Sequence, residues 1–314
     1  SNLGTSVRQL HRLSTSPSGL HLGHYKAMVS RHDVDLNTDE GQELESQRME
    51  LIRAHTSMLN YSLKHSYSYK RWRNVVNVMI AKEPGNSKIH RLRVIHIYEA
   101  DYNFLLQAKW RELIKHAEST KTLHPGQYGG RSGRDAKILV FLEELKTEIC
   151  YASQKSLINF DNDAASCYDR IIPALASLMG RKFGMHQNVI FVHATTLEGT
   201  KYKLKTSMGV SDEFYANCQA FPIYGTGQGS GNSPAIWCIV SSVLFACHEE
   251  KGHGAYFCTP DKQMSVSLSM VGFVDYSTGH VTQFALDLQP TSHFLRQLIH
   301  QDAQLYNHLR LDSS

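Results

Sequence analysis

Two aspartate-bearing segments, each directly after an apolar run, are the first candidates for chemistry in this chain. Asp161 and Asp163 follow a run that ends at Phe160, and Asp275 follows a second apolar run. Carboxylate oxygens are the ligands that Mg²⁺ prefers, and pairs of metal ions held in this way drive phosphoryl-type transfers. Taken alone, each aspartate is more often a turn or capping residue than a metal ligand.

A glycine-rich segment at 225–234, Gly-Thr-Gly-Gln-Gly-Ser-Gly-Asn-Ser-Pro, is the second candidate. Glycines let the backbone approach a ligand closely, and Ser233 and Pro234 are suited to begin a helix whose N-terminus favours an anion. By itself such a loop is a weak signal. It gains meaning only together with the aspartates.

The elements that must position these residues follow from the periodicity of the chain. Glycine and proline mark loops at 83–87 and 124–130. Pro173 either kinks its helix or lies near the first turn. Because helices and strands are interspersed with a hairpin, the sequence predicts an α+β fold. The expected strands lie at 75–80, 93–98, 157–160 and 202–205, with a hairpin of 265–273 and 279–284 that turns at Asp275-Tyr276-Ser277. The expected helices lie at 38–65, 100–116, 135–152, 164–182, 188–197, 233–247 and 291–309.

Composition limits the classes of function. The 314 residues are 41% hydrophobic, which is enough for a sizeable core in one or two domains. The net charge of +4 tolerates a nucleic-acid partner without demanding one. The six cysteines include no CxxC pair, and Cys167, Cys238 and Cys247 sit in apolar surroundings, which favours buried thiols in a reducing, intracellular compartment, either nuclear or cytoplasmic. No apolar run reaches the length of about 18 residues that spans a membrane, so no membrane partner is expected.

Several motifs occur in a fixed order along the chain, and their order is more specific than any one of them. Together they resemble the reverse transcriptases of non-LTR retroelements, over roughly residues 14–285. In chain order the matching segments are Ser16-Pro17-Ser18-Gly19, Lys82-Glu83-Pro84-Gly85, Arg93-Val94-Ile95, 127–134 (QYGGRSGR), 163–171 (DAASCYDRI), 225–234 and Phe273-Val274-Asp275-Tyr276.

The resemblance implies roles for residues around the aspartates. An aromatic follows the metal-binding aspartate of the family by five positions, which identifies Asp163 rather than Asp161 as the ligand and Tyr168 as that aromatic. Tyr168 would then exclude the ribose 2′-hydroxyl. Asp275 would be the second ligand of Mg²⁺, or of Mn²⁺ in its place. Asp161 is left as a cap, an exposed residue or a partial replacement for a lost carboxylate.

The resemblance also implies substrate contacts elsewhere. Lys82 and Arg93 would face the triphosphate, and Gln228 and Gly229 would lie beside the incoming nucleotide. Lys82 and Arg93 also suit ordinary solvated strand positions, and Gln228 also suits a plain loop. The basic cluster 70–73 (Lys-Arg-Trp-Arg) either touches a nucleic-acid backbone or is a solvated charge run.

One departure from the family pattern bears on activity. The family has a second aspartate where this chain has Tyr276. In the family, the retained pair holds the metal that escorts the triphosphate, and the missing carboxylate mostly serves the metal that activates the primer 3′-hydroxyl. We therefore expect nucleotide–metal binding to survive while catalysis is impaired. The rival interpretation is an inactive palm, retained as a nucleic-acid-binding module or left in a decayed retroelement copy.

The implied architecture is a polymerase right-hand palm, an antiparallel sheet backed by helices, with fingers at 1–125 and the palm at 126–314. The thumb usual for the family is expected to be missing, so we expect a fragment. Its reaction would join a dNTP to a DNA primer on an RNA or DNA template, and the oligomeric state stays open. A viral RNA polymerase shares the palm, but Tyr168 stands where those enzymes have a small residue.

Residues 17–25 also resemble the P-S-G-x-L-H-x-G-H signature of class I aminoacyl-tRNA synthetases. That fold needs an apolar strand just before the signature. Residues 11–15 do not form one, which disfavours this alternative.

Overall fold

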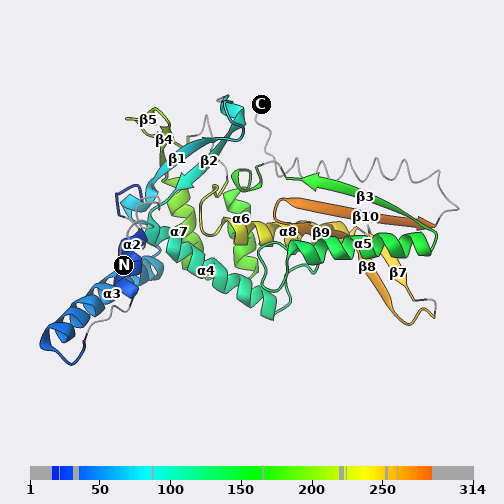
Figure 1. Cartoon of the computed structure of the whole chain (residues 1–314), viewed down its shortest axis with the longest axis horizontal. Coiled ribbons are helices and arrows are strands. Elements are labelled where there is room, and N and C mark those ends of the chain that lie inside the picture. The colour runs from blue at the N-terminus through cyan, green and yellow to red at the C-terminus, as the bar shows by residue number, and fades with distance from the viewer. Residues whose placement is uncertain are drawn as a thin grey trace. The chain divides into compact units, whose positions relative to one another are not determined.

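The computed structural model describes residues 16–20, 22–30, 35–86, 88–164, 166–218, 223, 225–251, 254–259 and 261–284. The chain divides into two compact units, and each unit is built from two separate segments (Figure 1). The first unit contains Ser1–Arg111 and Met185–Ser233, and the second contains Glu112–Gly184 and Pro234–Ser314. The predicted fingers and palm are functional regions that compactness alone does not test, so that division stays a prediction.

A five-stranded sheet is the centre of the first unit, with the order β2-β1-β4-β5 and β6 paired to β4. β1 runs antiparallel to β2 but parallel to β4. Alternate residues face the core: Val75, Asn77 and Tyr202 are buried, whereas their strand neighbours are more exposed. The strands are β1 (Asn74–Ala81), β2 (Leu92–Ile97), β4 (Lys201–Thr206), β5 (Gly209–Val210) and β6 (Tyr215–Ala216).

The helices of the first unit begin and end where local chemistry predicts. The longest begins behind Thr38, whose side chain accepts a hydrogen bond from the Gly41 N–H at 3.1 Å, and it ends at Ser66, whose φ of 52° is left-handed. Trp72 is fully buried and stacks on Tyr102 with ring centroids 5.1 Å apart. The helices are α2 (Leu22–Val29), α3 (Asp39–His65), α4 (Ala100–Ser119), whose first part belongs to this unit, and α7 (Gln187–Glu198).

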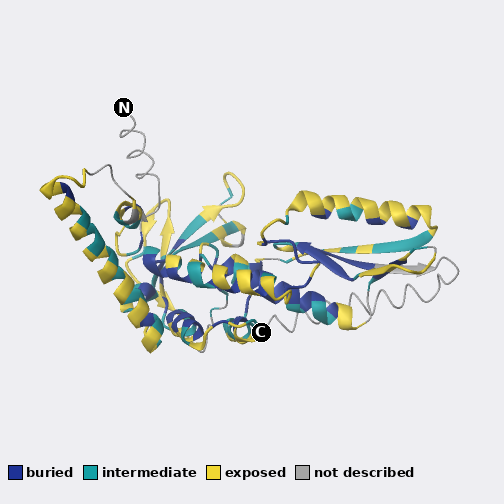
Figure 2. Cartoon of the chain, turned by 90° about the horizontal axis from the view of Figure 1, so that it is seen from below, coloured by how far each residue is buried: buried dark blue, intermediate teal, exposed yellow. Residues whose placement is uncertain are grey.

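The second unit contains a three-stranded antiparallel sheet with the order β3-β10-β9 and a separate β7–β8 pair. Helix α5 packs against β3 and β9 and leaves its other side exposed, whereas α8 is largely buried (Figure 2). The strands are β3 (Lys155–Asp163), β7 (Ala255–Cys258), β8 (Ser265–Leu268), β9 (Met270–Phe273) and β10 (Tyr276–Phe284). The helices are α5 (Ala136–Ala152), α6 (Pro173–Lys182) and α8 (Ser233–Glu250).

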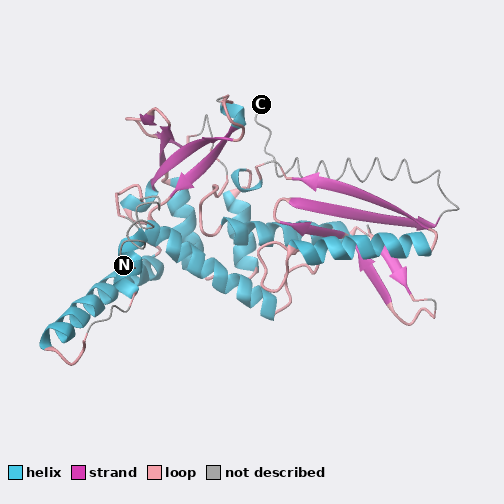
Figure 3. Ribbon diagram, in the orientation of Figure 1, coloured by secondary structure: helices cyan, strands magenta, loops and turns pink. Residues whose placement is uncertain are grey.

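Helices and mainly antiparallel strands alternate along the chain, which confirms the predicted α+β class (Figure 3). The helix expected over 164–182 instead begins at Pro173, because proline suits the first helical position and holds the preceding Ile172 extended, at ψ 115°. Residues 167–169 form a short 3-10 turn ahead of it. The expected helix at 291–309 lies outside the described residues. No helix in the described ranges is long and apolar enough to cross a membrane.

Candidate active site

A tight turn between β9 and β10 carries Asp275. Phe273 pairs with Tyr276, so only Val274 and Asp275 form the turn, one residue earlier than the sequence predicted. Val274 has a φ of 57°, a left-handed conformation that is an outlier for a β-branched residue. The Trp237 indole N–H donates to the Val274 carbonyl, and a Cβ on Gly129 would lie only 2.3 Å from the Val274 nitrogen. The surrounding chain therefore holds the turn in a costly conformation.

The pairing of β3 with β10 brings the two predicted metal ligands together. Asp163 lies opposite Tyr276, and the Ala164 N–H donates to the Asp275 carbonyl at 2.8 Å. Both aspartates are exposed. Within the described part of the chain, neither carboxylate has a hydrogen bond or ion pair. Two aspartates distant in sequence thus share one end of the sheet.

Burial, together with the charges of the two aspartates, raises the pKa values of side chains in the segment that follows β3. Burial raises the pKa of the Cys167 thiol to about 12, and the carboxylates of Asp275, Asp169 and Asp163 add to the effect. Burial also raises the pKa of the half-buried Tyr168 to about 12, with smaller contributions from Cys167 and Asp275. Tyr168 is therefore a neutral phenol beside the aspartates at neutral pH.

Tyr276 occupies the position of the carboxylate that the family pattern leads us to expect, and it is 45% exposed. Partial burial raises its pKa, and a hydrogen bond to Asp161 adds to the shift. Asp161 also accepts a hydrogen bond from the Thr278 hydroxyl at 2.8 Å. The Asp161 carboxylate is therefore hydrogen-bonded to side chains of β10. Its role as a replacement metal ligand stays a prediction.

The side chains at this sheet end fit a single hard cation. Asp163 and Asp275 offer oxygen donors, and Mg²⁺ commonly takes one or two protein carboxylates together with substrate phosphates. Among the residues that the structure describes, no group of three or more His, Cys, Asp or Glu side chains could hold a metal ion. The arrangement suits an ion that is completed by its substrate rather than a closed protein cage.

Four of the five predicted substrate contacts belong to the first unit, whereas Tyr168 belongs to the second. The Lys82 N–H donates to the Arg91 carbonyl at 3.0 Å, and Arg93 pairs with Ile80 across the same hairpin, with both side chains exposed. The His96 N–H donates to the Gln228 carbonyl at 2.6 Å, which fixes the glycine-rich loop against β2.

Gly229 in the same loop has a φ of +112°, and a Cβ there would lie 2.3 Å from the His96 carbonyl oxygen. Only glycine fits this approach without a shift of backbone.

A buried histidine supports the same loop from α7. The Asn232 amide group donates a hydrogen bond to His193 Nε2 at 3.0 Å. An amide nitrogen cannot accept a hydrogen bond, so His193 Nε2 carries no proton and the imidazole is neutral. Burial lowers the pKa of His193 to about 4 and that of His96 to about 4. This support could not be predicted from the sequence, because one histidine on an apolar helix carries no specific signal.

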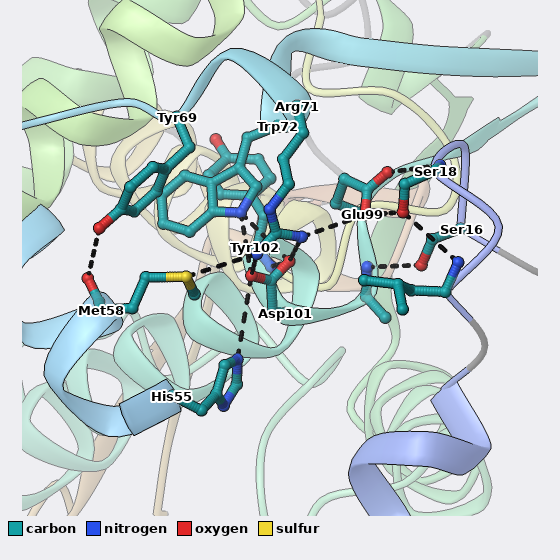
Figure 4. A network of polar contacts seen from close by, with 12 residues as sticks. Ser16, Ser18, His55, Met58, Tyr69, Arg71, Trp72, Glu99, Asp101 and Tyr102 are labelled. Carbon is teal, nitrogen blue, oxygen red and sulfur yellow. Dashed lines mark hydrogen bonds and ion pairs between the residues drawn. The ribbon is translucent and has the colours of Figure 1, made fainter. Parts of the chain in front are cut away.

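Within the basic cluster 70–73, Arg71 is paired and Trp72 is buried, whereas Lys70 is exposed. The Arg71 guanidinium lies 3.0 Å from Asp101 Oδ1 and 3.3 Å from Glu99 Oε2, and the Trp72 indole donates to Asp101 at 3.1 Å (Figure 4). Glu99 also accepts from the Ser18 N–H at 2.7 Å and the Ser18 hydroxyl at 2.8 Å. The cluster therefore ties the 16–20 loop to the start of α4.

Comparison with known proteins adds little to this geometry. No family model and no curated protein matches the chain. Among solved structures, the chain is similar to an apo telomerase from Candida tropicalis truncated from its C-terminal domain, with a TM-score of 0.49 and 11% sequence identity. The match covers 79% of this chain and 52% of that one, so the chain spans about half the length of that structure. At this TM-score the likeness carries no weight for fold or activity.

Proposed function

We propose that this chain is the fingers-and-palm region of a reverse transcriptase of the non-LTR retroelement type, impaired in catalysis. It would add dNTPs to a DNA primer 3′-hydroxyl on an RNA or DNA template. The main support is the Ala164–Asp275 hydrogen bond, which puts Asp163 and Asp275 side by side. These are the same two aspartates that the motif order singles out, although more than a hundred residues separate them.

The proposed roles follow from charge. Asp163 and Asp275 would hold one Mg²⁺ or Mn²⁺, which when bound neutralises phosphate charge and aligns the substrate. Lys82 and Arg93 would neutralise the rest of the triphosphate, since each has an exposed cationic side chain. Gln228 and Gly229 would lie beside the nucleotide, and the neutral ring of Tyr168 would exclude a ribose 2′-hydroxyl.

Tyr276 accounts for the proposed impairment. Its pKa is raised, so its side chain is a neutral phenol at neutral pH rather than the anion that a second metal ion requires. Deprotonation of the primer hydroxyl would therefore lack its usual assistance. Binding of a nucleotide with its metal would not depend on this residue.

Primer extension on an RNA template tests the catalytic half of the proposal. We expect the parent to extend barely and Tyr276→Asp to extend at least about a hundredfold faster, the scale of losing one preorganised charge. Tyr276→Phe, which removes only the hydroxyl, should behave like the parent. If the parent matches Tyr276→Asp, the account of Tyr276 is wrong.

Nucleotide binding tests the other half. Titration of a fluorescent dNTP with Mg²⁺ should give metal-dependent affinity in the parent and in Tyr276→Phe. Asp163→Ala should lose it. Equal affinity in the parent and in Asp163→Ala would contradict the proposed metal site.

The alternative is an inactive palm domain that only binds nucleic acid, and Tyr276 is the residue that favours it. Under this alternative, the parent binds primer–template while neither it nor Tyr276→Asp extends the primer. A decayed retroelement copy would in addition show no metal-dependent nucleotide binding.

A further inference from the structure

One face of the first unit's sheet carries a ladder of lysines. Lys201, Lys203 and Lys205 alternate along β4 with Tyr202, which is buried at 6% exposure, so the three lysines share the opposite face. Lys201 and Lys205 are exposed, and Lys203 is half-buried. Neither the motif order nor the aspartate site accounts for this ladder.

The strand pairings extend the same face across β1 and β2. Lys203 lies beside Val76, and Lys205 lies beside Val78. Further residues of this face are Ile97 opposite Val76, Ile95 opposite Val78 and Arg93 opposite Ile80. The face therefore combines an apolar strip with lysines along one side and an arginine at one end, and none of these residues is acidic.

The apolar strip leads into a cavity within the same unit. Ile95 and Ile97 line a cavity of about 610 Å³ together with Tyr25 and Phe104, and Lys26 also lines it. Its lining is mainly apolar, which suits the faces of flat rings, and the one acidic residue in its described lining, Asp101, is paired with Arg71. A single nucleic-acid strand exposes such rings, whereas a duplex keeps them stacked inside.

The lysines are available to an anion. Within the described residues, none of the three takes part in an ion pair, and the Lys203 ammonium lies 4.8 Å from the Phe214 ring centroid. Alternate residues of a strand are about 6.6 Å apart, so the outer lysines are about 13 Å apart. That spacing is too long for one phosphate group and suits a linear polyanion.

We infer that this face binds a single nucleic-acid strand, with its phosphates on Lys201, Lys203 and Lys205 and its bases toward the apolar strip and the cavity. Charge complementarity and the open rings of a single strand favour this occupant over an acidic polypeptide. The inference deepens the proposed function, because the strand would be the template leading toward Arg93. Only the assignment of the bound strand as the template rests on the proposed function.

Fluorescence anisotropy with a labelled single-stranded RNA, measured without primer or nucleotide, tests the inference. The triple variant Lys201→Gln, Lys203→Gln, Lys205→Gln should bind the RNA at least about tenfold more weakly near 0.1 M salt. The slope of log K plotted against log [salt] should also become shallower by about 2, since each phosphate contact on a single strand contributes about 0.7. The matched control is Lys115→Gln, Lys137→Gln, Lys182→Gln, which removes the same charge from exposed lysines of the second unit. It should keep the parent slope.

Three results would overturn the inference. One is an equal loss in both triple variants, which would indicate net charge alone. Another is a triple lysine variant of β4 that unfolds at the same temperature as the parent and keeps the parent's dependence of RNA affinity on salt. The third is lysine-dependent binding of a poly-glutamate peptide that is tighter than binding of RNA. Asp163→Ala should bind the strand like the parent, so failure of primer extension does not decide this test.

Discussion

At the scale of single residues, Val274 holds the turn before β10 in a strained conformation. Val274 keeps a left-handed φ of 57° that nothing in its own chemistry favours, and Trp237 and Gly129 hold it there. Strain of this kind persists where the surroundings determine it and is concentrated at functional sites. Tyr276, two residues on, stands where the family pattern leads us to expect a second carboxylate.

The strain at Val274 is open to measurement. Asparagine tolerates the left-handed region, whereas threonine keeps the branched Cβ of valine. Val274→Asn should therefore exceed Val274→Thr in free energy of unfolding by about 1 kcal/mol. Urea unfolding followed by tryptophan fluorescence gives the comparison, and equal midpoints for the two variants would show that the turn is not strained.

At the scale of elements, periodicity and turn chemistry predicted most helices and strands but not their partners. The lysine strand at 202–205 was predicted, yet its parallel pairing with β1 joins residues far apart in sequence. The sequence showed Arg71 only within a basic cluster, because its acidic partners, Glu99 and Asp101, are distant from it along the chain. Local patterns fix where an element begins, as at Pro173, whereas pairings depend on contacts that no local window contains. The proximity of Asp163 and Asp275 was predictable only through the motif resemblance.

The buried Arg71–Asp101 pair predicts a large cost when broken. The Asp101 side chain is fully buried, and the Arg71 side chain is 31% exposed. Asp101→Asn leaves the guanidinium without its counter-charge, and we expect a loss of about 3 kcal/mol in the free energy of unfolding. Glu83→Gln breaks the Glu83–Arg91 pair, whose side chains are 56% and 54% exposed, and should cost less than about 1 kcal/mol. Similar costs in urea unfolding would contradict the role of the network.

At the scale of the whole molecule, acid sensitivity should be concentrated in the first unit. His96 and His193 both have a folded-state pKa lowered to about 4 by burial, against about 6.5 when unfolded. The unfolded chain therefore binds more protons below pH 6.5, and stability falls as the pH drops from there until about pH 4. Protonation of His193 also breaks its bond from Asn232, which loosens the glycine-rich loop.

Stability against pH should show this directly. Each histidine accounts for at most about 3 kcal/mol between pH 6.5 and 4. His193→Gln should flatten the dependence of the urea midpoint on pH over that window. The exposed His116→Gln should leave it as steep as in the parent. A parent whose stability does not change across this window would refute the expectation.

The interleaving of the two units has a consequence for biosynthesis. Each unit needs a segment from the second half of the chain, and β3 cannot pair until β10 has been made. At about 5–20 residues per second, the ribosome takes on the order of ten seconds to supply that partner. During that interval the nascent chain carries β3 with both edges open, next to the exposed apolar side chains of α5. Chaperone demand during translation should therefore peak after β3 emerges and end once β10 has been completed.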